Sequence, residues 1–478
     1  MATLGQGVAE RPFDGDPDGD QDNARDVEGG LGTRARMRFL GIGDTCDLAA
    51  LYLRLVQDGH DVRVSITEPL CQDVLAGMVE RIADWENELG WVREAGPDGF
   101  ILFENVAHHR GALQERLRAD GFNVIGGSAY GDRLENDRAY AQGVLAELGL
   151  NVARTWHFDD FAAAIRFLES NPGRYVSKIN GPGLGAAGTY IGRLPDGRDT
   201  RAVLAAQARQ LAEEKPSLVL MEHVSGIEMG VGAYFDGERF LRPACLDWEH
   251  KHFFPGDLGE LVGEMGTVAT FDGTDRFFDA TLARMGERLR EGGYQGYVNL
   301  NTMVNADGIW PLEFTCRFGY PGFAVLEPLQ DIRWADLFRG LADRSLRTLP
   351  TRPGFSVGVV MTTRPFPFIR RYVDEPVGLP ILFEGALSET DRANLHLGEV
   401  GTQAGQLVTA GYHGWTAVVT GTGATVVAAK AAAYDLADRT VIPNVRYRRD
   451  IGDKLLAGDL ERLVAAGWVE RAGVTPVG

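Results

Sequence analysis

Hydrophobic and polar residues follow two different periods along this chain. Short apolar runs rich in β-branched and aromatic residues predict strands at 37–43, 61–67 and 99–104. Apolar residues spaced three or four positions apart predict helices between these strands, at 48–59 and 111–121. Strands that alternate with helices in this way indicate a parallel, doubly wound sheet.

The rest of the chain shows the same patterns in a different order. A long helix is predicted at 134–150, and strands and helices alternate again after about residue 340. The strands predicted between them are 174–179, 217–224, 228–236, 296–305 and 310–320. The fold class is therefore α/β with an α+β centre. We predict four segments: a disordered acidic extension at 1–36, a parallel α/β domain at 37–130, a central domain at 131–335 and a C-terminal α/β domain at 336–478.

The last strand of the central domain has two different faces, because side chains alternate along a strand. Four apolar side chains share the face that we expect to be buried: Leu312, Phe314, Cys316 and Phe318. The opposite face carries Glu313, Thr315 and Arg317. An acid, a hydroxyl and a base in a row are either an ordinary solvated surface or one wall of a polar site.

Composition and charge exclude several classes of protein. The formal net charge of −19 disfavours non-specific binding to nucleic acid, and no apolar run reaches the length of about 18 residues that a membrane span needs. The first residues lack the basic and apolar segments of a signal peptide. Four scattered cysteines without a CxxC pair favour buried thiols in a reducing cytoplasm over a zinc site or a disulfide framework.

Lys178 and the glycine-rich stretch that follows it are candidates for phosphate binding. Lysine occurs at five positions in the chain while arginine is abundant, and a compact ammonium suits a phosphate where a guanidinium does not fit. The stretch 180–190, which includes Gly185, has few side chains to keep an anion away from backbone N–H groups. The alternatives are a lysine that extends to water from a strand end and a surface hairpin.

The segment 217–236 combines apolar strands with acidic residues. Glu222 and Val224 end one predicted strand and Glu228 opens the next. A strand edge can offer main-chain groups to an adenine, and a carboxylate can accept hydrogen bonds from ribose hydroxyls. A plain hairpin is the alternative.

A polar loop with several glycines follows, and such loops often carry functional residues. It contains Lys251 and Asp257 together with His250 and His252. The two histidines would lie on opposite faces of an extended chain, which disfavours a metal site between them.

Oxygen ligands for a metal ion occur on neighbouring predicted strands. Asn299 and Asn301 share one face of the strand 296–305, and Glu313 lies on the next strand. Magnesium usually takes one or two carboxylates and completes its shell with phosphate and water. Arg317 would then face a transferred phosphate and neutralise its charge. An exposed acid and base pair, which adds little stability, is the alternative.

Together these segments resemble the ATP-grasp ligases, and among them the glycinamide ribonucleotide synthetases, which join phosphoribosylamine to glycine in purine synthesis. The resemblance runs from about Met37 to the C-terminus through separate blocks in the family's order. These blocks are the segment around Glu222 and Glu228, then His250-Lys251 with Gly256-Asp257 and Gly263-Glu264-Met265-Gly266, then Glu313 to Gly319, and finally Tyr447 to Gly452. The resemblance implies an ATP-grasp fold with a pre-ATP-grasp domain before it. It also implies a carboxylate–amine ligase that works through an acyl phosphate.

The resemblance implies roles for the matching residues. The residues expected to bind ATP are Arg138, Lys178, Gly185, Glu222, Val224 and Glu228. The expected ligands of Mg²⁺, or of Mn²⁺ in its place, are Glu313, Asn301 and Thr315. Lys251 and Arg317 are expected to act in catalysis, and Gly43, Asp257 and Arg317 to contact the substrates.

The chain departs from the family's pattern mainly around the substrates. Thr315 replaces an asparagine that normally shares the metal, and Asn301 is the candidate to compensate. The turn at Gly43 lacks the glycine pair followed by arginine, glutamate and histidine that helps to bind the sugar phosphate, and the glycine-rich loop has lost its lysine. The substrate loop carries Glu260, Leu261, Val262 and Glu264 where proline, asparagine, threonine and glycine are expected.

The best named reaction is therefore that of phosphoribosylamine with glycine. Two alternatives stay open: a divergent ligase that joins another carboxylic acid and amine in specialised metabolism, and an inactive ATP-binding or scaffold protein. The expected partners are small-molecule carboxylate and amine substrates, without nucleic acid or membrane, and the chain is expected to be a monomer or a homodimer.

Overall fold

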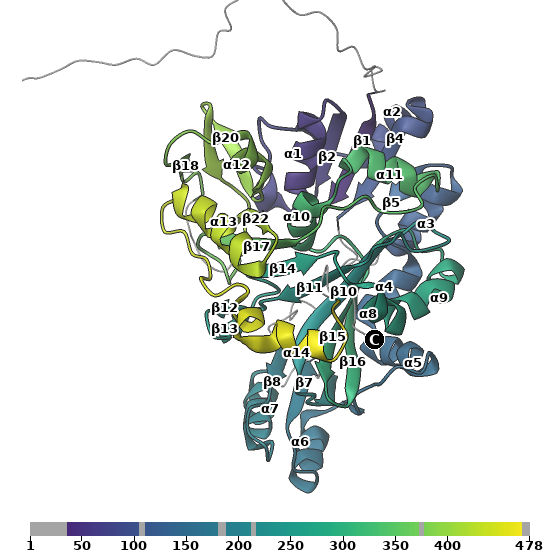
Figure 1. The fold of residues 1–478 in the computed structure, drawn as a ribbon, viewed down its shortest axis with the longest axis vertical. Helices are drawn as coiled ribbons and strands as arrows, with labels where there is room; N and C mark the ends of the chain where they lie inside the picture. The colour runs from purple at the N-terminus through teal and green to yellow at the C-terminus, as the bar shows by residue number, and fades with distance from the viewer. Residues whose placement is uncertain (1–35, 105–109, 180–187, 212–216, 372–376, 471–478) are drawn as a thin grey trace, which may run out of the picture. The chain divides into compact units, whose positions relative to one another are not determined.

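A computed structural model describes residues 36–104, 110–179, 188–211, 217–371 and 377–470. The predicted extension at 1–36 therefore lies outside the described residues except for its last position, and Gly185 lies outside them as well. The described residues, from Arg36 to Glu470, belong to one compact unit (Figure 1).

The N-terminal sheet is parallel, with the strand order β3-β2-β1-β4-β5, which confirms the doubly wound prediction. Its strands are β1 (Arg38–Gly43), β2 (Asp61–Ile66), β3 (Glu80–Ile82), β4 (Gly99–Phe103) and β5 (Asn123–Ile125). Its helices are α1 (Ala49–Gln57), α2 (Leu89–Glu94) and α3 (Gly111–Ala119). The strand order reverses between β1 and β4, the position where such sheets commonly bind ligands. Gly43 ends β1 at this position.

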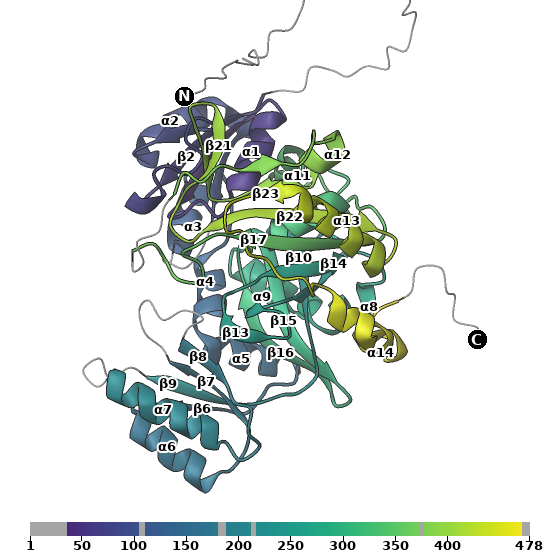
Figure 2. The same ribbon diagram turned by 90° about the vertical axis from the view of Figure 1, so that its left-hand side faces the viewer.

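A four-stranded antiparallel sheet follows, with the order β6-β9-β7-β8. Its strands are β6 (Thr155–Phe158), β7 (Tyr175–Ile179), β8 (Thr189–Ile191) and β9 (Leu218–Glu222). Helices α6 (Phe161–Ser170) and α7 (Arg198–Gln210) cover one face of it (Figure 2). Tyr175, Ser177 and Ile179 of β7 point into the helices, so Lys178 points to the other face.

The largest sheet has eight antiparallel strands in the order β16-β15-β10-β11-β14-β17-β22-β19. They are β10 (Ile227–Phe235), β11 (Cys245–Glu249), β14 (Gly266–Thr270), β15 (Gly296–Asn305), β16 (Gly308–Thr315), β17 (Phe355–Thr362), β19 (Leu395–Leu397) and β22 (Trp415–Gly423). Strands β14 and β17 pair over five residues. The predicted domain boundary at residue 335 therefore falls inside a continuous sheet.

Shorter elements surround this sheet. Three strand pairs are β12 (His252–Phe254) with β13 (Leu258–Leu261), β18 (Leu382–Phe383) with β23 (Thr440–Val441), and β20 (Val400–Gln403) with β21 (Gln406–Thr409). The other helices are α4 (Ala129–Asn136), α5 (Arg138–Glu147), α8 (Asp275–Ala280), α9 (Gly286–Glu291), α10 (Gly322–Leu326), α11 (Trp334–Ala342), α12 (Glu389–Ala393), α13 (Val426–Arg439) and α14 (Leu460–Ala465). Helix α11 packs against α1 and β5, and so joins the N-terminal sheet to the rest of the unit.

The single helix predicted at 134–150 is wrong, because the chain forms α4 and α5 with a break at Asp137. The Asp137 carboxylate accepts a hydrogen bond from the backbone N–H of Tyr140 at 2.9 Å. This side chain takes the place of a helical carbonyl and starts a new helix. The break places Arg138 at the first position of α5.

The predicted strand 310–320 also differs from the structure in two respects. Strand β16 ends at Thr315, so Arg317 follows the strand instead of lying in it. A bulge between β15 and β16 pairs Asn301 with Glu313 and Thr302 with Pro311, which leaves Leu312 as the extra residue. Leu312 is therefore only partly buried, whereas Phe314, Cys316 and Phe318 are buried as predicted.

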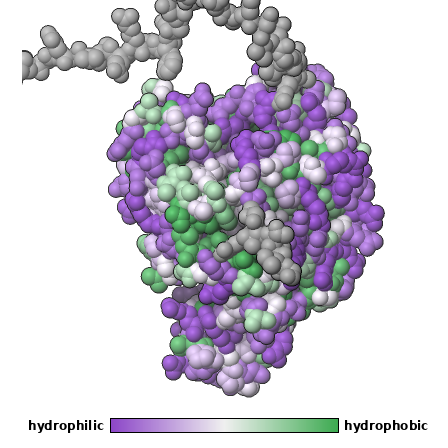
Figure 3. Space-filling model, in the orientation of Figure 1, coloured by the Kyte–Doolittle hydropathy of each residue, from purple (hydrophilic) through white to green (hydrophobic). Residues whose placement is uncertain are grey.

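Polar residues cover most of the face shown in Figure 3, with smaller hydrophobic patches between them. All four cysteines, Cys46, Cys71, Cys245 and Cys316, are buried free thiols, as the sequence predicts. Within the described part of the chain, no helix has the length and apolar character needed to cross a bilayer.

Candidate active site

A cavity of about 460 Å³ is lined by residues of the four-stranded sheet and of the eight-stranded sheet. Seven residues predicted to bind ATP or metal line it: Arg138, Lys178, Glu222, Val224, Glu228, Asn301 and Glu313. Lys251, predicted to act in catalysis, and Asp257, predicted to contact substrate, line it as well. These residues come from segments far apart in the sequence. The fold therefore brings together side chains that the sequence motifs had singled out separately.

The lining of this cavity includes apolar side chains. There are seven of them: Val176, Ile191, Met221, Val224, Leu261, Met303 and Leu312. Strict alternation along β16 would have placed Leu312 on the buried face of the strand. The bulge instead turns this side chain into the cavity. Apolar walls with a few polar groups are typical of sites for a flat organic ring. Glu222 and Val224 lie in the same lining, as predicted for residues beside an adenine.

The cationic side chains of Arg138 and Lys178 line the cavity. Arg138 donates a hydrogen bond to the Glu313 carboxylate at 2.6 Å. Burial, together with the neighbouring Arg138, lowers the pKa of Lys178. Because Lys178 has no anion within ion-pair distance in the described structure, its ammonium is available for a phosphate.

Lys251 lies at the centre of three carboxylates. Its ammonium is 2.9 Å from Glu228, 3.3 Å from Glu249 and 3.3 Å from Glu313. Lys251, with Arg138 and Lys178, lowers the pKa of Glu313 to about 2 against the effect of burial. Glu313 is therefore ionised throughout the physiological pH range.

The oxygen donors here fit a magnesium ion that is also held by phosphate. Glu313 is ionised and pairs in register with Asn301, whose amide N–H donates to Glu228 at 2.8 Å. No cluster of three or more acidic, histidine or cysteine side chains in the described ranges could hold a metal alone. Magnesium usually takes one or two carboxylates and fills its shell with substrate phosphate and water, which agrees with this donor set.

A second cavity, of about 210 Å³, adjoins the first. Glu249, Lys251, Gly263 and Glu313 line both cavities. Thr315 and Arg317, which were predicted to act on metal and substrate, line the second cavity alone. The two cavities thus meet at Glu313 and Lys251.

The side chain of Arg317 is held by Glu135, a residue of helix α4. Its guanidinium donates to Glu135 at 2.9 Å, and the same carboxylate accepts from the backbone N–H of Cys316 at 2.8 Å. Glu135 raises the pKa of Arg317, so the side chain stays charged. Helix α4 therefore fixes the chain at the point where β16 ends.

Three acids in the second cavity were not among the predicted site residues: Asp247, Glu249 and Glu264. Burial raises the pKa of Asp247 to about 8 and that of Glu264 well above its usual value. Asp247 accepts from the Asn299 amide at 2.6 Å. A signal was present in the sequence, since Asp247 lies between Leu246 and Trp248 in an apolar strand.

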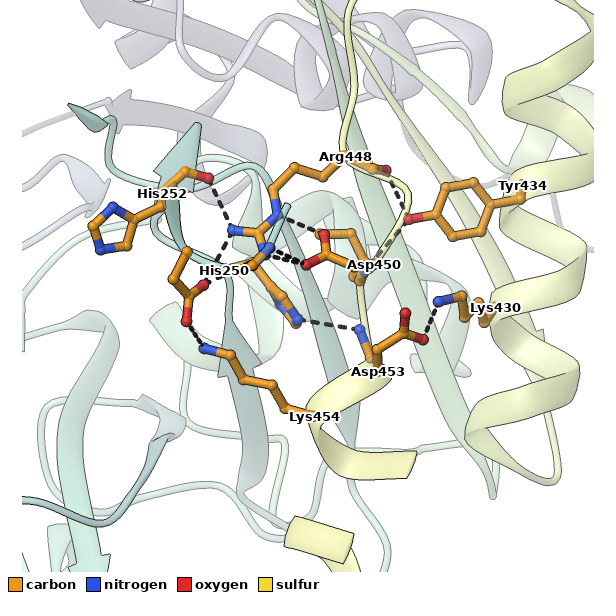
Figure 4. A network of polar contacts seen from close by, with 12 residues as sticks. His250, His252, Lys430, Tyr434, Arg448, Asp450, Asp453 and Lys454 are labelled. Carbon is orange, nitrogen blue, oxygen red and sulfur yellow. Dashed lines mark hydrogen bonds and ion pairs between the residues drawn. The ribbon is translucent and has the colours of Figure 1, made fainter. Parts of the chain in front are cut away.

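The C-terminal segment Tyr447 to Gly452 contacts the loop that carries Lys251 (Figure 4). Arg448 is fully buried and donates to Asp450 at 2.6 Å, to the carbonyl of His252 at 3.0 Å and to Asp257 at 3.3 Å. Lys454 forms an ion pair with Asp257 and lines the first cavity. Asp257, predicted to contact substrate, therefore lines the first cavity within a network of ion pairs. Sequence reasoning missed Lys454.

His250 belongs to the same network (Figure 4). Its Nε2 atom accepts a hydrogen bond from the backbone N–H of Gly452 at 3.2 Å. Burial and the cations Arg448 and Lys454 lower the pKa of His250 to about 4. His250 is therefore neutral at pH 7 and connects two segments of the chain.

Gly43 lines neither cavity in the described structure. A Cβ atom at this position would lie 1.9 Å from the carboxylate of Glu104. That carboxylate accepts from the backbone N–H of Asp47 at 3.0 Å. Close approach of a buried acid accounts for the glycine, and a substrate contact at Gly43 stays a prediction.

Comparison with known proteins gives matches over most of the chain. Residues 136–323 match the family model Phosphoribosylglycinamide synthetase, ATP-grasp (A) domain. A phosphoribosylamine–glycine ligase from a Nostoc species is 28% identical over 351 residues, which cover 71% of this chain and 80% of the relative. The ligase of the same name from Pseudomonas aeruginosa is 25% identical and covers 88% of this chain and 99% of the relative.

Solved structures show a similar fold. A phosphoribosylamine–glycine ligase from Thermotoga maritima has a TM-score of 0.67 at 22% identity and covers 87% of this chain and 100% of its own. A biotin carboxylase from Campylobacter jejuni has a TM-score of 0.59 at 12% identity, with coverage of 89% and 96%. The architecture described above is therefore shared with enzymes of different named activity.

Proposed function

We propose that this chain, whose central domain is an ATP-grasp domain of the phosphoribosylglycinamide synthetase type, is an ATP-dependent ligase that joins a carboxylic acid to an amine. The observation that carries the proposal is the junction of the two cavities. The first cavity has apolar side chains in its wall and contains Lys178, which has no ion-pair partner among the described residues. It meets the second, polar cavity at Glu313 and Lys251. Such a junction suits transfer of a phosphoryl group from a nucleotide to a second substrate.

The reaction would proceed in two steps. A carboxylate oxygen attacks the γ-phosphorus of ATP, the bond from that phosphorus to the β,γ-bridging oxygen breaks, and ADP leaves. The amine nitrogen then attacks the carbonyl carbon of the acyl phosphate, the carbon–oxygen bond to phosphate breaks, and the amine gives up a proton. The amide and inorganic phosphate are the products.

The residues of the junction position the reacting groups and balance charge. Lys178 and Arg138 would hold ATP phosphates, and Glu222, Val224 and Glu228 would bind the adenosine. Lys251 and Arg317 would neutralise charge on the transferred phosphoryl group, and such preorganised charges lower the barrier without later reorganisation. A bound Mg²⁺, or Mn²⁺ in its place, would supply Lewis-acid stabilisation of the phosphate charge, with Glu313, Asn301 and Thr315 as its protein ligands.

Other properties are proposed on the same basis. The substrates would be small molecules, and nucleic acid would not be a partner because the net charge is −19. Free, buried cysteines agree with a reducing cytoplasm. The chain would act as a monomer or a homodimer, with the four segments proposed from the sequence.

The named reaction of the relatives, phosphoribosylamine with glycine, is the first candidate for this chain. A second candidate is a ligase for another acid and amine. It is favoured by the acids Asp247 and Glu264 in the second cavity, where Glu264 replaces a glycine of the resembled family. Rescue of a purine auxotroph would separate the two, because only the first candidate restores growth.

Isotope transfer tests the acyl phosphate. The enzyme would be incubated with ATP, Mg²⁺, phosphoribosylamine and glycine labelled with ¹⁸O in its carboxylate. We expect one ¹⁸O atom in each phosphate released, because the carboxylate oxygen stays with phosphorus when the acyl phosphate breaks. ADP release with unlabelled phosphate would contradict the mechanism. ATP binding without cleavage would exclude this pair of substrates and leave the second candidate and an inactive ATP-binding protein.

A further inference from the structure

The second cavity is lined by more acidic than basic side chains. Its four acids are Asp247, Glu249, Glu264 and Glu313, and its two cations are Lys251 and Arg317. Lys251 is shared among Glu249, Glu313 and Glu228, while Arg317 pairs with Glu135, which lies outside this lining. Among the residues that the structure describes, neither Asp247 nor Glu264 forms an ion pair. The cavity therefore holds two acids, Asp247 and Glu264, without a counter-ion in the described part of the chain.

Four polar atoms of the lining are buried without a hydrogen-bond partner among the described residues. They are Oδ1 of Asp247, Oε1 of Glu264, Oγ1 of Thr267 and the hydroxyl oxygen of Tyr320. Asp247 is 6% exposed and Thr267 is 3% exposed, so bulk water does not reach them freely. Buried polar groups in proteins are nearly always hydrogen-bonded. Unpaired polar atoms that line one cavity thus indicate a polar ligand there.

A protonated amine has the chemistry that this lining lacks. It supplies up to three N–H donors and a positive charge. The aromatic rings of Tyr297 and Tyr320 also line the cavity, and aromatic faces attract ammonium groups. Asp247 and Glu264 offer a phosphate no positive charge, whether they are protonated or ionised. The volume of about 210 Å³ is also below the roughly 300–1,000 Å³ typical of sites for larger ligands.

We propose that the second cavity binds the amine substrate through a positively charged amino group and that this substrate carries no phosphate. The inference rests on the proposed ligase function and names the substrate class for its second candidate. Asp247 and Glu264 receive the ammonium, and Thr267 accepts a further hydrogen bond. Glu249 and Lys251 separate this group from the nucleotide cavity.

Calorimetry on nucleotide-loaded protein tests the proposal. The whole chain would be saturated with a non-hydrolysable ATP analogue and excess Mg²⁺, then titrated with α,ω-diamines of two to five carbons or with ribose 5-phosphate. At least one diamine is expected to bind, and Asp247→Asn and Glu264→Gln are each expected to weaken that binding at least tenfold. Glu287→Gln, an exposed acid of α9, serves as the matched control.

The outcomes distinguish failure of the amine-site inference from failure of the proposed ligase function. Binding of the ATP analogue to every variant shows that the variants are folded and that the nucleotide site is present. The inference is overturned if no diamine binds, if ribose 5-phosphate binds more tightly than every diamine, or if both variants keep the wild-type affinity. Excess Mg²⁺ would occupy the cavity if it were a metal site, and the diamines would then fail to bind. Failure of the analogue itself to bind would contradict the ligase function instead.

Discussion

At the scale of single residues, charge pairing decides which groups can act. Glu313 is ionised because three cations surround it, whereas Asp247 holds its proton to about pH 8 because burial outweighs its amide partner. Two buried carboxyl groups therefore differ in charge at neutral pH because their neighbours differ. The ionised carboxylate beside Lys251 can serve phosphate chemistry, whereas the acid beside Asn299 stays protonated near neutral pH unless a bound cation ionises it.

His250 gives a pH prediction at this scale. Its folded-state pKa of about 4 lies below the ordinary value near 6.5, so between these pH values the unfolded chain binds a proton and the folded chain does not. The free energy of unfolding should fall as the pH falls through this window, by up to about 3 kcal/mol in total. His250→Asn should show a smaller fall.

Urea denaturation at several pH values between 7.5 and 4.5 measures this effect. His252→Asn is the control, because His252 lies two residues away and its Nδ1 makes one exposed contact, at 3.0 Å, with the Gly259 carbonyl oxygen, which can only accept. If the free energy of unfolding depends on pH equally in His250→Asn and the wild type, His250 does not cause the loss of stability at low pH.

At the scale of elements, the C-terminal segment supports the loop that carries Lys251. Arg448 bridges Asp450 and Asp257 and is completely buried (Figure 4). Removing one partner from a buried ion pair leaves uncompensated charge in a low-dielectric environment. The position of the loop should therefore depend on a residue almost at the end of the chain.

Arg448→Met should lower the free energy of unfolding by about 3–5 kcal/mol, because Asp450 and Asp257 lose their buried cation. Arg449→Met is the matched control: its side chain is exposed and pairs with Asp438, so its loss should change stability by about 0–1 kcal/mol. Denaturant titration of both variants measures the difference. Similar losses in the two variants would contradict the structural role of Arg448.

The sequence predicts these elements to different degrees. Alternation along a strand placed Glu313 and Thr315 on one face, because a period of two holds in any strand. The bulge at Leu312 was not predictable, since it depends on pairing with β15. Lys454 was missed for a similar reason: its partner Asp257 is distant in sequence, and no local pattern connects the two.

At the scale of the whole molecule, one continuous sheet joins parts that look separate in the sequence. Strands before and after residue 335 pair directly, and helix α11 returns to cover the N-terminal sheet. Such long-range pairing can be inferred from a family resemblance but not from local periodicity. It holds the two cavities in contact, which is the property that a phosphoryl transfer between substrates requires.

The central claim is that ATP is cleaved at the junction formed by Glu313. The most direct test measures ADP formation from ATP and Mg²⁺, without and then with phosphoribosylamine and glycine, for the wild type, Glu313→Gln and the control Glu287→Gln. We expect Glu313→Gln to lower the rate at least about 100-fold, as loss of a preorganised charge contact commonly does, while Glu287→Gln stays near the wild-type rate. Wild-type rates in Glu313→Gln would contradict the account.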